Sequence, residues 1–287
     1  MLFKRDSILT LLFTALFSSQ SFANEVPNKS QYTLWNPTPR ELMREMSTDR
    51  PDKTESPYTV DAGHFQIETD ILSYTRDRHN HDDERVDAWG FFNANFKVGL
   101  CNYTDLQVVV PTYNSVRTKN RIAGTTERHH GFGDLVTRLK INFWGNDGGQ
   151  TAFAAMPYLK FPTAQDNLGN GAIEGGIIFP LAVALPNEWS MGLMTQFDFA
   201  EDGDGIGYHP EFINTITFGH GIVGNLAGYV EFFSLVSTER NSDWIGTFDL
   251  GLTYALTEDI QLDTGINFGL TRSADDVNPF LGVTWRY

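Results

Sequence analysis

The stretch VDAWGFFNANFKVGL, residues 86–100, alternates between two faces over its whole length. Its even positions are all apolar or small, and its odd positions carry the polar side chains, among them Asp87 and Lys97. Strands of soluble proteins are usually about 5–6 residues long, whereas a tilted strand that crosses a membrane needs about 9–11. The stretch therefore predicts a spanning strand whose even face meets lipid and whose odd face meets the lumen of a barrel.

The same period of two recurs from residue 64 to the last residue and gives about twelve strands. The connections alternate between tight turns such as LPNEW and longer or more charged segments such as residues 114–131. Outer-membrane barrels have short periplasmic turns and longer outer loops, and an even strand number places both termini on the turn side. We therefore expect residues 63–287 to form an all-β fold, a transmembrane antiparallel up-and-down β-barrel. The alternative is a secreted soluble β-sandwich, which would bury its apolar face.

Aromatic residues lie near the ends of the expected strands. Rings with one polar edge favour membrane interfaces, where they form a girdle at each side of the bilayer. We expect one girdle on the turn side, from Tyr103, Trp144, Trp189 and Tyr254, and another on the loop side, from Tyr113, Tyr208 and Trp244.

The N-terminus has the pattern of an export signal. Lys4 and Arg5 precede the apolar run ILTLLFTALF, and small residues follow around Ala23. This pattern predicts a signal peptide at residues 1–23 that is removed from the mature protein. The next longest apolar run, at residues 177–185, is too short for a membrane-spanning helix and is interrupted by Pro180. A helical membrane protein is therefore excluded. Export and a barrel together predict a bacterial outer membrane.

The formal net charge of −15 argues against a nucleic-acid partner, because phosphate binding requires a basic surface. The partners that we expect are outer-membrane lipid, a small-molecule solute and the barrel-assembly machinery.

Residues 24–62 show no strand alternation and are expected to form a periplasmic or lumenal leader. Within it, Thr38 could cap a short helix at residues 39–46 that begins with Pro39. The stretch STDRPDKTESPYTVDAGHFQIE, residues 47–68, resembles the entry motif of an outer-membrane family of transporters assigned to the meta-pathway of phenol degradation. The resemblance implies an outer-membrane barrel and uptake of aromatic or other small hydrophobic compounds.

Four charged residues of this motif could form charge-assisted hydrogen bonds inside the barrel mouth. They are Asp49, Arg50, Asp52 and Glu55. A barrel of twelve strands is wider than the filled eight-stranded kind, so the leader could partly plug it. The alternative is a mobile periplasmic segment.

Charged side chains on the expected lumen face divide into two groups. One wall is basic and the rest is acidic; the candidate pore-lining residues are Lys97, Arg138, Lys140 and Lys160, and Glu68, Asp70, Asp198, Asp249 and Asp263. This division suggests a transverse field across a narrow, wet pore that favours polar or amphiphilic solutes. Alternatively, the charges pair with one another and fill the interior.

Other motifs do not predict a chemical site. HNHDDE at residues 79–84 and EDGDG at residues 201–205 offer metal-ligand side chains but read better as solvated outer loops, as do His129 and His130. No nucleophile or phosphate-loop motif is present. We therefore expect no metal, no cofactor and no enzyme.

These features favour a passive channel or transporter for small molecules, with aromatic or hydrophobic compounds as candidate solutes. Two alternatives stay open. The first is a barrel that does not conduct and serves envelope structure or adhesion, and the second is an outer-membrane enzyme that modifies lipids.

Overall fold

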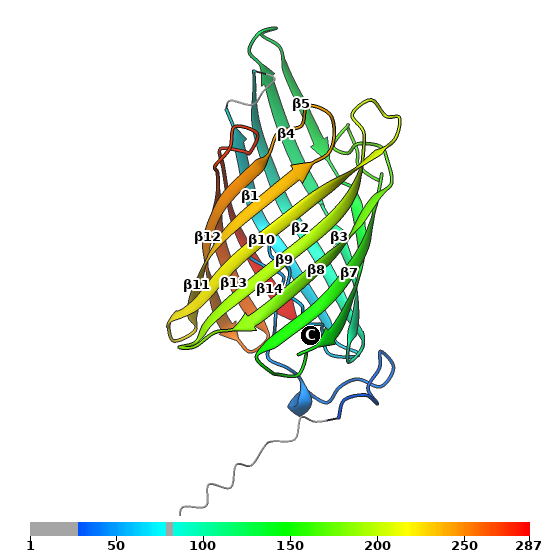
Figure 1. Ribbon diagram of the computed structural model, residues 1–287, viewed down its shortest axis with the longest axis vertical. Helices are drawn as coiled ribbons and strands as arrows, with labels where there is room; N and C mark the ends of the chain where they lie inside the picture. Colours follow the sequence, from blue (N-terminus) through cyan, green and yellow to red (C-terminus); the bar gives the residue numbers. More distant parts are fainter. Residues whose placement is uncertain (1–27, 79–82) are drawn as a thin grey trace, which may run out of the picture.

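The computed structural model describes residues 28–78 and 83–287, which form a closed barrel of tilted strands (Figure 1). The predicted signal peptide lies outside the described residues. The strand segments in chain order are β1 (Phe65–Asp77), β2 (Glu84–Cys101), β3 (Thr104–Val110), β4 (Tyr113–Asn120), β5 (Thr126–Gly131), β6 (Leu135–Trp144), β7 (Thr151–Phe161), β8 (Glu174–Ala184), β9 (Trp189–Glu201), β10 (Tyr208–Val223), β11 (Leu226–Ser237), β12 (Ile245–Thr257), β13 (Ile260–Gly269) and β14 (Val277–Arg286).

The 14 segments make twelve crossings of the membrane. Two of these crossings are interrupted once each, one between β3 and β4 and the other between β5 and β6. β3 pairs with the lower half of β2 and β4 with its upper half, and only Pro111 and Thr112 separate them. β5 and β6, separated by residues 132–134, pair with β4 and β3 in turn. All pairs are antiparallel, and β1 closes the wall by pairing with both β2 and β14. The predicted antiparallel barrel of about twelve strands is confirmed.

Short and long connections lie at opposite ends of the barrel, as predicted. The C-terminus and the first part of the described leader, drawn in blue, lie at the end with the short turns (Figure 1). The turn between β2 and β3 takes only residues 102–103, whereas residues 162–173 connect β7 to β8 at the opposite end. Short turns mark the periplasmic side of such a barrel, so the leader enters from the periplasm.

Residues 114–131, predicted to be one of the longer connections, mostly form strands instead. β4 and β5 form a regular hairpin there, with a turn at residues 121–125, and it rises above the rest of the wall (Figure 1). β2 is 18 residues long, and its outer half pairs with β4, which satisfies backbone groups that would otherwise lack partners. The many charged residues of the hairpin concealed its alternation.

Large apolar side chains cover the outside of the wall, while polar side chains are buried inside it. On β11 to β13 the exposed residues are Val230, Phe232, Phe248, Leu250, Leu252 and Phe268. Their neighbours Glu231, Asp249 and Asp263 are at most 2% exposed. A protein folded in water would show the opposite arrangement, so the outer face is a lipid-facing surface.

The predicted aromatic girdles are on the outside of the barrel. All seven rings are between 44% and 52% exposed: Tyr103, Trp144, Trp189, Tyr254, Tyr113, Tyr208 and Trp244. Such half-exposed rings at both ends of the strands suit the two membrane interfaces.

The predicted face assignment is wrong for the outer halves of β1 and β2, because both strands contain an irregularity near their middle. Ile71 and Phe92 are skipped between the pairs Asp70–Asn93 and Leu72–Phe91, and Phe92 has a φ of 53°. One extra residue in a strand moves every later side chain to the opposite face. Below Phe92 the even positions of β2 face lipid as predicted, whereas above it the odd positions do.

Three contacts establish this change of face. A Cβ on Gly90 would lie 2.6 Å from Ser73 Oγ and 2.7 Å from Nδ2 of the lumenal Asn93, so Gly90 faces the lumen. On the lumenal side of the neighbouring strands β14 and β1, Asn278 donates from Nδ2 to Thr75 Oγ1 at 2.9 Å. On the outside, Trp89 is 42% exposed, and its ring centroid lies 4.4 Å from that of Tyr74.

The predicted helix at residues 39–46 is reduced to a single 3-10 turn, η1 (Arg40–Leu42). Pro39 occupies the N-cap position and no side chain caps it; Thr38 is buried and its hydroxyl has no hydrogen-bond partner. The chain leaves the helical conformation at Met43, and the side chain of the next residue, Arg44, binds Asn102 and Asp147 in turns of the barrel. No helix among the described residues is long and apolar enough to cross a membrane.

Spin labels placed on adjacent residues test the change of face. With the only cysteine, Cys101, replaced by serine, nitroxides are attached to Ala88→Cys and Trp89→Cys in separate variants. We expect the label at 89 to be the more accessible to oxygen, which partitions into lipid, and the label at 88 to a water-soluble nickel chelate. The opposite result would show that the even positions of β2 face lipid along the whole strand and would contradict the change of face.

Candidate functional site

Residues 47–60, called the plug segment below, lie inside the barrel. Side chains from β1, β2, β6, β10, β11, β12 and β13 contact them, so the segment is surrounded by wall on all sides. With Pro51 and Pro57 in it and no alternation, this stretch is unsuited to join the wall as a strand. It therefore satisfies its backbone through wall side chains.

Asp49 is the most heavily bonded residue of the plug segment. Lys140 Nζ donates to Asp49 Oδ1 at 2.6 Å, and Lys97 binds the other carboxylate oxygen. The backbone N–H of Asp49 donates to both oxygens of Glu68 at 3.1 Å. Lys140 is fully buried, and the other three side chains are at most 9% exposed. Buried charges are tolerated when they are paired and hydrogen-bonded, and this network meets both conditions.

Arg50 points to the opposite wall. Its guanidinium donates to Asp263 Oδ1 at 2.7 Å and pairs with Asp70 Oδ1 at 2.8 Å, and it lies 5.6 Å from the ring centroid of Phe280. Gly282 makes room for it, because a Cβ there would lie 2.1 Å from Nη2 of Arg50. A fork-shaped cation between two carboxylates is well suited to this position.

Lys53 and Thr54 are held by the acidic wall. Glu231 accepts their backbone N–H groups at 2.9 and 2.8 Å, one on each carboxylate oxygen. Lys53 Nζ pairs with Asp249 Oδ2 at 3.1 Å and lies 4.5 Å from the ring centroid of Phe233. Glu231 is 1% exposed, so its charge is satisfied almost entirely by the plug segment.

Glu55 completes the set by returning to the basic wall. Arg138 Nη1 donates to Glu55 Oε1 at 2.6 Å. The hydroxyls of Ser47 and Ser56 lie 2.8 Å apart, and the Ser56 N–H donates to Asp49 Oδ1 at 2.9 Å, which closes residues 47–56 into a loop. The acidic residues of the loop thus face the basic wall, and its basic residues face the acidic wall.

A second cluster anchors the leader at the periplasmic mouth. Arg44 donates to Asn102 Oδ1 at 2.6 Å and pairs with Asp147 Oδ1 at 3.1 Å and with Asp61. Lys29 pairs with Asp147 at 2.8 Å. Burial opposes ionisation, but hydrogen bonds from Asn102 and Lys29 and the charge of Arg44 together hold the pKa of Asp147 below its usual value.

Two cavities open beside this anchor. One, of about 630 Å³, is lined by both polar and apolar side chains, including Met43, Met46 and Tyr58. The other, of about 500 Å³, lies on the far side of residues 43–46, against the turns that follow β10 and β12. Volumes of about 300–1,000 Å³ suit a small organic molecule.

Most of the predicted lumenal charges contact the plug segment. They are Glu68, Asp70, Lys97, Arg138, Lys140, Asp249 and Asp263. Two others bind wall residues instead: Lys160 pairs with Glu174, and Asp198 accepts hydrogen bonds from Tyr158 and Gln196. That these residues line a conducting pore stays a prediction.

The motif residues and one missed residue complete the site. Asp49, Arg50 and Glu55 are the ion-paired residues described above, and Asp52 is half-buried beside Thr217. Sequence reasoning missed Glu231, because the strand around it is apolar on both faces and its register was uncertain. Glu231 is the only charged residue in LAGYVEFFSLVS, the sequence of β11. This was the signal that could have placed Glu231 in the lumen.

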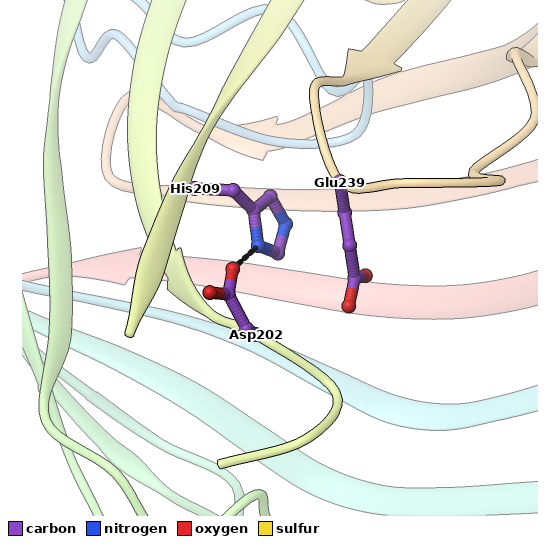
Figure 2. A group of neighbouring side chains, drawn as sticks. All are labelled: Asp202, His209 and Glu239. Carbon is purple, nitrogen blue, oxygen red and sulfur yellow. Dashed lines mark hydrogen bonds and ion pairs between the residues drawn. The ribbon is translucent and has the colours of Figure 1, made fainter. Parts of the chain in front are cut away.

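One predicted metal candidate is brought together with other residues in the outer loops. Asp202 of the EDGDG motif, His209 of β10 and Glu239 lie with their ligand atoms within 4.8 Å of one another (Figure 2). His209 Nδ1 lies 2.9 Å from Asp202 Oδ1, and Nε2 lies 3.5 Å from Glu211. A protonated imidazole with a carboxylate at each nitrogen accounts for this geometry. A metal would need one nitrogen to leave its carboxylate.

The other loop candidates do not converge in this way. His129 and His130 face Asp166 of the loop after β7, at 3.6 and 3.7 Å. His79 and His81 of the HNHDDE motif lie outside the described residues.

Comparison with known proteins agrees with this architecture. A family model described as "Putative MetA-pathway of phenol degradation" matches residues 48–287, which include nearly all of the plug segment. An outer membrane channel from Pseudomonas putida F1 is similar in structure, with a TM-score of 0.61 and 13% identity over 84% of this chain and 100% of that one. The NanC porin is similar at a TM-score of 0.49 and 10% identity, over 77% of this chain and 98% of that one. No curated protein matches the sequence.

The fold and the lipid-facing surface locate the protein. A closed barrel of twelve antiparallel crossings, with an apolar outside, aromatic girdles and a polar interior, is a bacterial outer-membrane structure. The predicted localisation is therefore confirmed.

Replacing Gly282 by alanine tests how Arg50 fixes the plug segment. The added methyl group must displace the guanidinium from Asp70 and Asp263. We expect amide hydrogen exchange at Asp49 and Lys53 to accelerate ~10-fold, since hydrogen bonds between charged groups each contribute ~1.5–3 kcal/mol. Gly221→Ala is the matched control, because a Cβ at that position meets nothing within 4 Å. Unchanged exchange in Gly282→Ala would contradict the role given to Arg50.

Acidification tests the anchor at the mouth. A carboxyl whose pKa is lowered by folding stabilises the folded form above its unfolded pKa, and this contribution is lost as the pH falls through the folded value. We therefore expect exchange of the amides of residues 58–61, corrected for the intrinsic rate, to accelerate below pH ~4. Asp147→Asn should accelerate exchange already at pH 6 and weaken the pH dependence. An equal pH dependence in both proteins would assign it to another group.

Proposed function

This chain belongs to the phenol-degradation family, and we propose that it is a passive outer-membrane channel for small molecules, with aromatic or other hydrophobic compounds as its solutes. The observation that carries the proposal is the plug segment, a loop inside a polar lumen that is held by charge pairs rather than by apolar packing. Such a loop is joined to the wall by interactions that water and a solute can replace. A loop built only to fill the barrel would need no complementary charges.

The charges of the loop and the wall are matched in position. Asp49 and Glu55 face Lys97, Lys140 and Arg138, whereas Arg50 and Lys53 face Asp70, Asp249 and Asp263. When the loop shifts, both walls expose their charges to the lumen and create a field across it. That field favours solutes with a polar group beside an apolar body.

The cavity of about 630 Å³ at the mouth supports the same solute class. Met43, Met46 and Tyr58 supply an apolar lining. The charged lining is mixed, with the cations Lys29, Arg44 and Arg286 beside the carboxylates Glu41, Glu45, Asp61 and Asp147. An aromatic ring with an acidic or hydroxyl substituent matches this combination in size and chemistry. Passage through such a channel needs no catalytic residue, so the absence of enzymatic activity is part of the proposal. Insertion by the barrel-assembly machinery is part of it too.

A barrel that does not conduct is the second candidate function. The observation that favours it is the complete pairing of Asp49, which leaves that residue bound on both oxygens. Conductance measurements separate the two candidates.

Charge reversal in the lumen is the decisive experiment. In planar bilayers we expect Arg138→Glu to raise the open probability at least ~10-fold, because it replaces the Glu55 pair with a repulsion. The double variant Arg138→Glu with Glu55→Arg restores a pair of opposite charges and should return the open probability towards the original value. Arg240→Glu, in the exposed loop after β11, is the control for a charge change outside the lumen.

Flux of solute completes this test. Liposomes that contain the protein should take up benzoate faster with Arg138→Glu than with the unmodified chain. If neither protein passes ions or benzoate, the channel function fails and the barrel that does not conduct stands. If ions pass but benzoate does not, only the solute class fails.

A further inference from the structure

The outer halves of β1, β2, β4 and β5 carry a group of cations on the outside of the barrel, called the arginine patch below. The residues are Arg76, Arg85, Arg117, Lys119 and Arg128. They face outward because of the irregularities at Ile71 and Phe92, which place the odd positions of β2 above Phe92 on the same face as Trp89. With uninterrupted alternation, Arg85 and Asp87 would face the lumen.

The patch concentrates positive charge on an acidic chain. The pairs Arg76–Asp87, Asp87–Arg117 and Arg117–Arg128 place three of these cations and Asp87 in one row across four strands. Asp87 pairs with Arg85 at 2.9 Å and lies 3.5 Å from Arg76. Asp87 thus forms ion pairs with two of the five cations, and the patch is basic on a chain that has 36 acidic and 21 basic residues.

One feature of the row points to an anion. Arg117 and Arg128 lie directly opposite one another, and like charges in that position are destabilising unless an anion lies between them. Nε of Arg76 adds nothing to this argument, because it lies 3.5 Å from Asp87 Oδ1 and is already faced by a carboxylate.

The cations lie beside a cavity with an aromatic floor. This cavity, of about 340 Å³, is lined by Tyr74, Asp87, Trp89, Ser115, Arg117 and Arg128. Below it a row of rings continues around the wall, with centroid distances of 4.4 Å for Tyr74–Trp89 and 6.1 Å for Phe91–Tyr113. The cavity therefore offers guanidinium donors above and an apolar surface below.

The height of the patch matches the headgroup layer. From Leu100 at the periplasmic end to Trp89, a strand tilted by about 40° rises about 28 Å, close to the apolar band of about 25 Å. Asp87 and Arg85 then lie about 5–10 Å higher. The patch thus faces neither the acyl chains nor bulk water but the polar layer of the outer leaflet.

We propose that the arginine patch is a binding site for the phosphorylated headgroup of an outer-leaflet lipid, with phosphate between Arg117 and Arg128 and an acyl chain against Trp89. Bidentate contacts to phosphate are what paired arginines form best. The aromatic floor commits the site to a lipid rather than to free phosphate, because a free anion gains nothing from it.

The test compares lipids that differ only in phosphate. Protein in phosphatidylcholine nanodiscs is titrated with diphosphoryl lipid A and with its dephosphorylated form, and Trp fluorescence or native mass spectrometry reports binding. We expect a clear preference for the diphosphoryl form. Each guanidinium lost should weaken binding ~5-fold, so Arg117→Gln with Arg128→Gln should weaken it ~30-fold.

Controls make every outcome decisive. Arg240→Gln removes an exposed arginine from the loop after β11 and should leave binding unchanged. The mobility of unheated protein on a gel shows that each variant forms its barrel. Equal binding by the double variant, or equal binding of both lipids, would overturn the proposal. Displacement of the lipid by millimolar inorganic phosphate would overturn the commitment to a lipid.

Discussion

Direct charge pairing between the plug segment and the wall is the interaction on which the interior depends. Breaking a buried ion pair by removing one partner costs about 3–5 kcal/mol, because the remaining charge is left unpaired. Lys140 and Asp249 are both fully buried, and each has its charge partner in the plug segment. The polar interior of the barrel therefore requires the plug segment as much as the plug segment requires the wall.

In the channel proposed above, this mutual dependence would keep the loop in place and still allow it to open. The pairs of Asp49 with the basic wall and of Arg50 with the acidic wall hold the loop from two sides. A solute with a polar group would replace one side at a time, whereas apolar packing would offer it nothing to replace. The anchor around Arg44 and Asp147 would keep the leader attached at the mouth during such a movement.

The outer surface depends on a different constraint, the pairing register. A spanning strand with strict alternation has one lipid face throughout. The irregularities at Ile71 and Phe92 interrupt the alternation near the middle of β1 and β2. The outer side of these strands therefore presents apolar residues to the acyl chains and arginines to the headgroups. One strand thereby meets two layers of the membrane.

The sequence by itself determined the barrel, its approximate strand number, the end at which the turns lie and most lumenal charges. These follow from local periodicity, since the side chains of a strand alternate whatever its neighbours are. Asp49, Arg50 and Glu55 were also predictable as residues of the mouth, because charges between prolines cannot join a wall.

Only the tertiary structure decided which charges meet, since Asp49 and Lys140 or Arg50 and Asp263 are far apart in the chain and come together through closure of the barrel. It also decided the role of Glu231, whose strand has two apolar faces, and the hairpin at β4 and β5, whose pairing depends on the length of β2. The change of face at Phe92 was also hidden from the sequence, because Val86, Ala88 and Gly90 continue the apolar or small residues of the even positions although they face the lumen.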